Sequence, residues 1–336
     1  MPKDGVIKAM HASAAQYVQS GIKGPDRVGS SRYLPPIRTV KECPKDGHSN
    51  PKSSLRHCPS LVVVRRSNGL ARVAEELTYR DEAAAGYDGA FARVTTHFAP
   101  YLLRAAHIAP GMRVLDIAAG TGLAAEAALN IVGPTGHVIA ADLSPAMVEK
   151  SRGRLGHAKN ASVAVEDGQA LSFPDESFDA VVCSLGLMFF PDPLRGLAEF
   201  RRVLRPGGRV AVSVNTVPGR SYNTRINLAI ARHVPSLAAA AARVFSLGDE
   251  MKLRSLLEVA DFRDVEITTE MHRFVLPSFD AYFEPFEKGA GSAGQAFVSL
   301  SAEARKAVRE EVRSDLGDTG GIIAVDVEYR LAGGRR

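Results

Sequence analysis

Short apolar runs alternate with longer amphipathic stretches through the middle of the chain, and this alternation is what most constrains its fold. The runs have the length of buried strands, and the stretches between them repeat apolar residues at helical spacing. We expect strands at 112–117, 137–142, 161–166, 178–184 and 209–215. We expect helices at 122–132, 145–154 and 193–204, the second capped by Ser144 and the third stopped by Pro206-Gly207-Gly208. Strands joined by helices of this length predict a doubly wound α/β fold with a parallel sheet and right-handed crossovers.

The regions on either side of this alternation are expected to complete the same domain. Apolar residues at helical spacing predict a helix from Tyr87 to Leu103. Beyond residue 215 the pattern predicts a helix at 249–260 and strands at 262–274 and 322–331. The stretches near 217–248 and 278–316 look helical and are expected to be cover insertions. We therefore assign residues 81–336 to one domain.

Residues 1–80 differ in composition from the rest of the chain. The chain has 42 Lys and Arg against 37 Asp and Glu, and residues 1–75 contain 13 of the former against five of the latter. The segment is rich in Pro, Gly and Ser, so it buries too little apolar area to offset the entropy of ordering. We expect it to be disordered or loosely packed, with a targeting peptide or a start codon placed too far upstream as alternatives. Its basic charge is only weak evidence for nucleic-acid binding, so a nucleic-acid partner is unlikely.

The three cysteines, Cys43, Cys58 and Cys183, form no Cys-x-x-Cys pair and no metal-ligand spacing. A low, odd cysteine count suits a reducing compartment, so we expect a cytoplasmic protein without a bound metal. No apolar run has the length of a membrane helix. The sequence says nothing about the oligomeric state.

The first chemical motif runs from Val114 to Leu123, where a strand leads through Gly120 and Gly122 into a helix. Glycines let the backbone approach a ligand closely, and the free N–H groups of the helix start can face its polar groups. Asp142, 20 residues after Gly122, ends the next strand and can accept hydrogen bonds from two ribose hydroxyls. Both features fit a dinucleotide as well as S-adenosylmethionine, and a ligand-free turn with Asp142 as a cap is a further alternative.

Two carboxylates favour S-adenosylmethionine over a dinucleotide. Asp116 ends the first strand, where it can hold an α-ammonium group but would repel a pyrophosphate. Asp167, in the loop after the third strand, can accept from an adenine amino group, with Gln169-Ala170 beside the ring. A solvated loop acid is the alternative for Asp167.

Five motifs occur in order, and together they resemble the class I methyltransferases of the ubiquinone/menaquinone-biosynthesis type (methyltransferase type 11). They are Asp116–Gly122, Asp142-Leu143-Ser144-Pro145, Asp167-Gly168-Gln169-Ala170, Phe178-Asp179-Ala180-Val181 and Leu204-Arg205-Pro206-Gly207-Gly208. The resemblance implies a Rossmann-like sheet of seven strands in the order 3-2-1-4-5-7-6, with the last strand antiparallel. It also implies S-adenosylmethionine as cofactor, bound by Tyr87, Asp116, Ala118, Gly120, Gly122, Asp142, Leu143, Met147, Asp167, Gly168, Gln169 and Ser184.

The chain departs from this family pattern at two points. Ala118 stands where the family usually has the first glycine of the loop. About 40 residues separate the last two strands, where the family has a tight hairpin, which suggests a cover over the acceptor site.

The segment after the fourth strand, Ser184 to Phe190, normally faces the acceptor and is apolar and aromatic here. It lacks the Asn/Asp-Pro-Pro-aromatic motif of exocyclic-amine nucleic-acid methyltransferases, which favours a small apolar or aromatic molecule as the partner. The candidate acceptor-binding residues are Leu187, Met188, Phe189 and Tyr222, although such a stripe is often core packing. Methyl transfer by in-line displacement needs alignment more than a catalytic base; His233 and His272 are weak candidates for one, and Tyr282 for acceptor binding. An NAD-dependent oxidoreductase and a non-catalytic S-adenosylmethionine-binding protein remain the alternatives.

Overall fold

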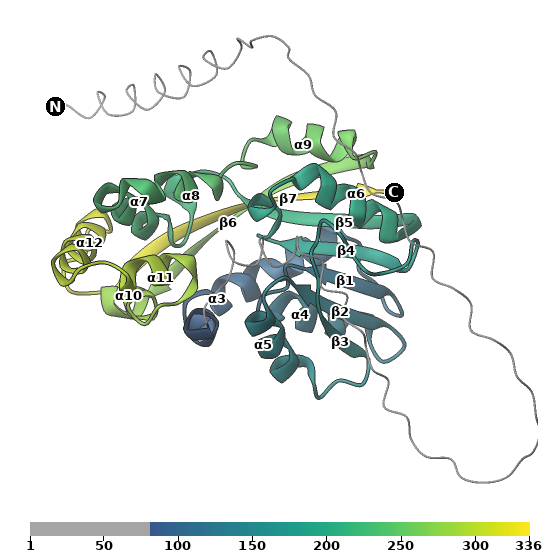
Figure 1. Ribbon diagram of the computed structural model, residues 1–336, viewed down its shortest axis with the longest axis horizontal. Coiled ribbons are helices and arrows are strands. Elements are labelled where there is room, and N and C mark those ends of the chain that lie inside the picture. Colours follow the sequence, from purple (N-terminus) through teal and green to yellow (C-terminus); the bar gives the residue numbers. More distant parts are fainter. Residues whose placement is uncertain (1–80) are drawn as a thin grey trace, which may run out of the picture. The chain divides into compact units, whose positions relative to one another are not determined.

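The computed structural model describes residues 81–336, and the segment expected to be disordered lies outside them. Seven strands form one sheet in the order β3-β2-β1-β4-β5-β7-β6 (Figure 1). Their bounds are β1 Arg113–Ile117, β2 His137–Asp142, β3 Ala161–Val165, β4 Phe178–Ser184, β5 Leu204–Asn215, β6 Arg263–Leu276 and β7 Ile323–Arg335. Strands β3, β2, β1, β4 and β5 pair in parallel, and β7 is antiparallel to both of its neighbours. The expected fold class, strand order and antiparallel last strand are confirmed.

Helices cover both faces of the sheet because side chains on successive strand residues point to opposite sides. On one face α3 (Asp81–Ala105), α4 (Leu123–Val132) and α5 (Pro145–Leu155) pack on Val114, Val138 and Val182. On the other face α6 (Pro193–Val203) and α9 (Glu250–Val259) pack on Leu115, Val181 and Val212. The predicted cap of α5 is present, since the Ser144 hydroxyl accepts from the Met147 N–H.

The two regions expected to be cover insertions are helical, and their helices pack together in a separate layer. The first contains α7 (Thr224–His233) and α8 (Ala238–Arg243); the second contains α10 (Phe279–Glu287), α11 (Gly291–Val298) and α12 (Ala302–Asp315). These helices lie around the extended ends of β6 and β7 (Figure 1). Their core is largely aromatic and includes Phe98 from α3, Phe274 from β6 and Tyr329 from β7. We call this layer of α7, α8, α10, α11 and α12 the cap.

Strand β5 begins at Leu204, five residues before the expected start at Arg209. Pro206-Gly207-Gly208 does end α6, but the chain pairs with β4 on both sides of this turn. The register with β4 shifts between Phe178 and Ala180, which accommodates the extra residues as an irregularity. Gly207 has a φ of 80°, a value that a side chain would disfavour.

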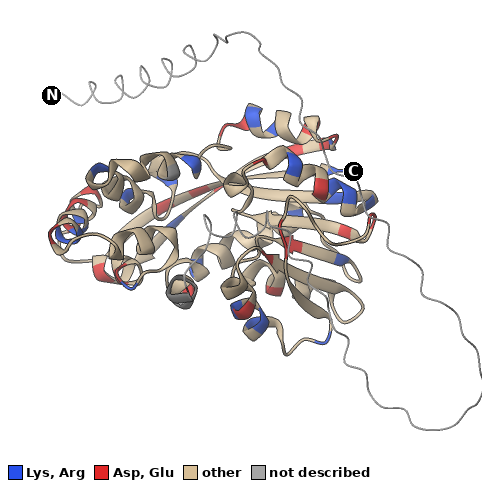
Figure 2. Ribbon diagram, in the orientation of Figure 1, with Lys and Arg blue, Asp and Glu red and all other residues tan. Residues whose placement is uncertain are grey.

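Acidic and basic residues are interspersed over the described domain, and α12 shows this clearly (Figure 2). Among the described residues, no helix combines the length and the hydropathy needed to cross a bilayer.

Candidate functional site

The loop between β1 and α4 is shaped by residues in left-handed backbone conformations. Gly120 and Gly122 have φ values of 56° and 84°. A Cβ on Gly122 would lie 2.5 Å from Ser151 Oγ, so the loop lies directly on α5 there. A Cβ on Gly120 would meet no atom within 4 Å, which leaves the backbone at that residue open to a ligand. Ala118, the departure from the family pattern, has a φ of 55° and so adopts the glycine-like conformation despite its side chain.

Asp142 connects the end of β2 to this loop. One carboxylate oxygen accepts from the Gly120 N–H at 2.9 Å, and the other accepts from the Ser144 N–H at 2.9 Å. Burial raises the pKa of Asp142, and the backbone N–H groups around it oppose that rise. Asp142 is therefore both a cap before α5 and an anchor of the glycine loop. Each oxygen keeps a lone pair for a further donor.

Asp116 is the most unusual polar group in the described domain. Its side chain is fully buried, and neither carboxylate oxygen has a hydrogen-bond partner. Burial and, secondarily, the negative charge of Asp142 raise the pKa of Asp116 to about 8; the Ala125 N–H opposes the rise without forming a full hydrogen bond. A buried carboxylate without a partner costs free energy and calls for an explanation. A cationic group of a ligand would supply the missing partner.

Asp116 and Asp142 lie on the same side of the sheet. Asp116 is paired in register with Ala140, and Asp142 follows two residues later on the same strand. Both acids therefore share the face on which Val114, Val138 and Ala140 contact α4 and α5. The influence of the Asp142 charge on the Asp116 carboxyl reflects the same proximity. The structure thus brings the two predicted strand-end acids together beside the glycine loop.

The loop after β3 carries Asp167 and is fastened to α6. One Asp167 oxygen accepts from the Gln169 N–H, while the Gln169 side chain points toward α6 and accepts from the Asp192 N–H at 2.8 Å. The Arg195 side chain in turn donates to the Gln169 carbonyl at 2.9 Å. The side chain of Gln169 therefore holds the loop in place, and its predicted contact with the cofactor stays a prediction.

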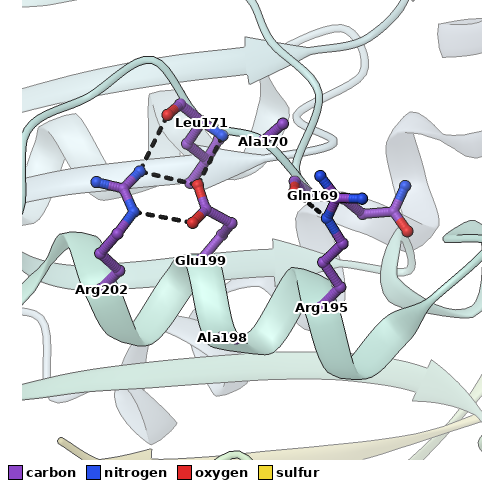
Figure 3. Close-up of a pocket in the computed structure, with 7 residues that line it drawn as sticks. All are labelled: Gln169, Ala170, Leu171, Arg195, Ala198, Glu199 and Arg202. Carbon is purple, nitrogen blue, oxygen red and sulfur yellow. Dashed lines mark hydrogen bonds and ion pairs between the residues drawn. The ribbon is translucent and has the colours of Figure 1, made fainter. Parts of the chain in front are cut away.

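A surface hollow of about 470 Å³ lies between this loop and α6. Figure 3 shows the residues that line it. Glu199 accepts from the Leu171 N–H, and Arg202 donates to the Leu171 carbonyl while it pairs with Glu199. That pairing lowers the pKa of Glu199. The charged groups of Arg195, Glu199 and Arg202 are engaged with the loop or with one another, so we interpret the hollow as part of the scaffold rather than as a ligand site. Sequence reasoning missed Arg195, Glu199 and Arg202, because helix positions facing a distant loop carry no local signal.

The remaining predicted cofactor residues surround the carboxyl ends of the strands. Leu143 follows β2, Met147 is buried on α5, and Ser184 ends β4 half-buried. Gly168 is buried against the ring of Phe190, where a Cβ would lie 2.4 Å from the ring. Tyr87, in the N-terminal part of α3, stacks near Phe91 with ring centroids 4.8 Å apart.

The predicted acceptor residues lie deeper than the sequence suggested. Leu187 and Met188 are 0% and 1% exposed and belong to the core on the α6 side of the sheet, whereas Phe189 is half-buried. Tyr222 is buried in the cap, and its carbonyl accepts from the Tyr282 hydroxyl at 2.6 Å. Burial raises the pKa of both tyrosines, so neither is suited to act as a base near neutral pH. Acceptor contact by these residues stays a prediction.

The two histidines proposed as weak candidates for a base have partners of their own. His233 ends α7, where its ring lies 3.7 Å from a carboxylate oxygen of Glu311 on α12. His272 lies on β6 and stacks on His97 of α3, with ring centroids 3.8 Å apart. Neither interaction involves the strand-end acids, so a catalytic role for either histidine stays a prediction.

The region that matches a known family coincides with this site. Residues 115–212 match the model of a family described as "Methyltransferase domain". A demethylmenaquinone methyltransferase of Clavibacter sepedonicus is 37% identical over 169 residues, which are 46% of this chain and 67% of that protein. A ubiquinone/menaquinone biosynthesis C-methyltransferase of Ectopseudomonas mendocina is 39% identical over 122 residues, or 35% of this chain and 48% of that protein. The chain thus spans about half the length of the second relative.

A solved structure with the same fold supports this comparison. The phosphoethanolamine N-methyltransferase 2 of Haemonchus contortus, solved with phosphomonomethylethanolamine and S-adenosylhomocysteine, aligns with a TM-score of 0.51. The alignment covers 80% of this chain and 60% of that one at 17% identity, so it speaks to the fold alone. The sheet order, the strand-end acids beside a glycine loop and the relatives agree: the chain belongs to the class I S-adenosylmethionine-dependent methyltransferases.

Proposed function

We propose that this chain transfers a methyl group from S-adenosylmethionine to a small, largely apolar or aromatic acceptor. The observation that carries the proposal is the buried, unpartnered carboxylate of Asp116 beside the open backbone of Gly120. An amino-acid–nucleoside conjugate offers an ammonium group for that carboxylate at a distance from its ribose. A dinucleotide offers a pyrophosphate, which Asp116 would repel.

Each end of the cofactor has a complementary group in the chain. Asp116 would pair with the α-ammonium, and Asp142, which keeps a lone pair on each oxygen, would accept from the ribose hydroxyls. Asp167, held by the fastened loop after β3, would face the adenine amino group. When bound, the cofactor supplies an activated methyl carbon on a sulfonium.

The chain's own contribution to the transfer is alignment and exclusion of water. An in-line displacement gains most of its rate from holding the two reacting atoms in line and close together. The segment after β4 presents Leu185 and Phe189, both partly buried and packed against the core clusters, so it offers apolar contacts. An apolar surrounding excludes water and strengthens the interactions of charged groups within it. The residues at this rim thus suit an apolar acceptor whose attacking atom needs no strong base.

The relatives suggest which acceptors to test first. The two relatives named above are, by their names, a demethylmenaquinone methyltransferase and a ubiquinone/menaquinone biosynthesis C-methyltransferase, and the quinones in these names are largely apolar ring compounds. We infer a ring of this kind, a naphthoquinol or a phenol, as the acceptor class.

Cofactor binding is tested by isothermal titration with S-adenosylhomocysteine. The wild-type chain should bind, and Asp142→Ala should bind about tenfold or more weakly, because hydrogen bonds to a charged group contribute about 1.5–3 kcal/mol each. Asp326→Ala is the matched control, since Asp326 lies on β7 and pairs with Arg273. No binding by the wild-type chain at millimolar ligand would refute the proposal.

Turnover is tested by transfer of a radiolabelled methyl group to a panel of acceptors. A demethylated naphthoquinol and simple phenols represent the proposed class, and phosphoethanolamine represents a polar, charged alternative. Label in the apolar compounds alone supports the proposal. Label in phosphoethanolamine alone would contradict the acceptor class and leave the cofactor assignment standing.

A further inference from the structure

Three elements far apart in the sequence meet at Thr121, the residue between the two glycines of the cofactor loop. The Thr121 hydroxyl donates to one oxygen of Asp88 on α3 at 2.6 Å. Arg154, in the last turn of α5, donates to the other Asp88 oxygen at 2.5 Å and to the Thr121 carbonyl at 2.9 Å. We call Asp88, Thr121 and Arg154 the clasp.

All three nitrogens of the Arg154 guanidinium and both oxygens of Asp88 take part in these contacts. Each Asp88 oxygen accepts one bond, and Arg154 also donates to Glu126 of α4 at 3.0 Å. Thr121 is 3% exposed, although Asp88 and Arg154 reach partly into solvent. A planar guanidinium that engages several acceptors fixes their relative positions more firmly than a single ion pair does. The clasp therefore holds Thr121 through contacts that are separate from the bond between Asp142 and Gly120.

The loop needs such an anchor because of its glycines. Glycine has more accessible backbone conformations than any other residue, so Gly120 and Gly122 would otherwise make this loop entropically costly to order. The Gly120 N–H is bonded to Asp142, which fixes the loop on the ribose side. With Thr121 held by the clasp, the loop is fixed on both sides before the cofactor arrives.

The clasp also connects the loop to the cap through α3. Gly86 of α3 lies against Ala290, and a Cβ at that glycine would be 3.4 Å from the Ala290 side chain. Gly291, the first residue of α11, lies so close to Phe91 of α3 that a Cβ would be 2.7 Å from its ring. The segment of α3 that contains Asp88 thus contacts the cofactor loop on one side and the start of α11 on the other.

We propose that Asp88 and Arg154 are positioning residues that hold the glycine loop in its cofactor-binding shape and couple cofactor binding to the order of α3 beneath the cap. They act through Thr121, and the proposal does not require contact between either residue and the cofactor. It rests on the cofactor binding proposed above.

The sharpest test compares two substitutions at Thr121. Thr121→Val has nearly the same shape but lacks the hydroxyl, whereas Thr121→Ser keeps the hydroxyl and loses a methyl group. By isothermal titration with S-adenosylhomocysteine, Thr121→Val should bind about tenfold more weakly, and Thr121→Ser should bind within about threefold of the wild type. Asp88→Ala, at a partly exposed helix position, is the second variant and should resemble Thr121→Val.

Two further measurements separate positioning from a general loss of stability. In the double variant Thr121→Val/Asp88→Ala, the two losses should not add, because both substitutions break the same contact. Hydrogen exchange of residues 86–94 should slow when S-adenosylhomocysteine binds to the wild type and to Thr121→Ser. This protection should be smaller in Thr121→Val. Arg152→Ala is the control, since Arg152 lies on α5 close to Arg154 of the clasp but pairs with exposed Glu149.

The outcomes are distinct. Equal affinity of Thr121→Val and the wild type would overturn the positioning role, and so would an equal loss in Thr121→Ser. Additive losses in the double variant would show that the residues act independently and would also overturn it. Unchanged protection of residues 86–94 in Thr121→Val would overturn the coupling to α3. No binding by the wild type would instead refute the proposed function.

Discussion

Replacing Asp116 by Asn should stabilise the cofactor-free protein and weaken cofactor binding, because the same buried charge has opposite effects on the two. The folded protein raises the pKa of this carboxyl from 3.8 to about 8, so folding at neutral pH requires the uptake of a proton. A group whose pKa is raised by folding lowers stability as pH increases from its unfolded to its folded pKa. Stability should therefore fall between about pH 4 and pH 8, and Asn lacks this titration.

The free-energy cost of this proton uptake follows from the difference between the working pH and the ordinary pKa of Asp. At pH 7 that distance is about three units, and one unit corresponds to about 1.4 kcal/mol, so the proton uptake costs roughly 4 kcal/mol. The Asn amide, like the neutral carboxyl, would be buried without partners, so that cost is common to both proteins. We expect Asn to raise the free energy of unfolding by about 2–4 kcal/mol at pH 7 and by about 1 kcal/mol at pH 5.

The assay is thermal unfolding at several pH values, followed by titration with S-adenosylhomocysteine. For a domain of this size, about 1 kcal/mol shifts Tm by roughly 2–4 °C, so a gain of about 2–4 kcal/mol should raise the Tm of the variant by about 4–16 °C at pH 7. The difference should shrink at pH 5. Its affinity should fall about tenfold to a hundredfold, because a charge-assisted hydrogen bond to the ammonium is lost.

Asp326→Asn is the matched control for a general effect of removing an acid. The guanidinium of Arg273 lowers the pKa of Asp326, which is the opposite of the direction at Asp116, so its removal should not stabilise the protein. The reasoning is refuted if the Tm advantage of Asp116→Asn is absent at pH 7 or does not grow with pH. Undiminished affinity in that variant would refute the role of Asp116 toward the ammonium.

Three further predictions rest on single contacts. The affinity of the wild type for S-adenosylhomocysteine should rise from pH 6 to pH 8 as Asp116 loses its proton, and titrations of Asp116→Asn should show a flatter pH profile. Gly122→Ala should lower the free energy of unfolding by about 1–3 kcal/mol, because φ is 84° and the new methyl group would lie 2.5 Å from Ser151 Oγ. Urea unfolding measures this loss of stability, and an unchanged midpoint would contradict the steric argument. Tyr282→Phe should lower the free energy of unfolding by about 1–3 kcal/mol, because the buried Tyr222 carbonyl would lose its hydrogen-bond donor. The same urea experiment tests this, and an unchanged midpoint would mean that another donor replaces the Tyr282 hydroxyl.

The parts of the fold that rest on local periodicity could be predicted from the sequence. Strands β1 to β4 and helices α4 to α6 lie within a residue or two of their expected bounds. Strands β1, β2 and β4 are buried almost throughout, which gives short apolar runs, and the helices repeat apolar residues at helical spacing. The strand order could not be obtained from periodicity and came from the resemblance of ordered motifs. The early start of β5 was missed because Pro206-Gly207-Gly208 is typical of a turn, and only the pairing with β4 shows that the chain stays in the sheet.

At the site, too, residues placed by local pattern could be predicted and residues placed by distant contacts could not. Asp116 and Asp142 could be predicted to meet, because the ends of adjacent parallel strands share one edge and period-two alternation fixes their side. The orientation of the Gln169 side chain could not, because it depends on Asp192, 23 residues away in the next loop. Asp88 and Arg154, 66 residues apart, lie on two helices whose relative position is set by packing alone.

The position of Asp116 shows why this site combines binding with instability. An ammonium group pairs strongly with a carboxylate only where water does not compete, so the acid must be buried to bind well. Burial without the ligand, however, leaves the carboxylate unpartnered and raises its pKa. The free protein can carry this cost because the rest of the site is held by contacts that do not involve the ligand: Asp142 to Gly120, the clasp to Thr121, and α6 to the loop after β3. Cofactor binding then supplies a partner for the Asp116 carboxylate in a site whose shape is already fixed, which favours affinity because little ordering remains to be done.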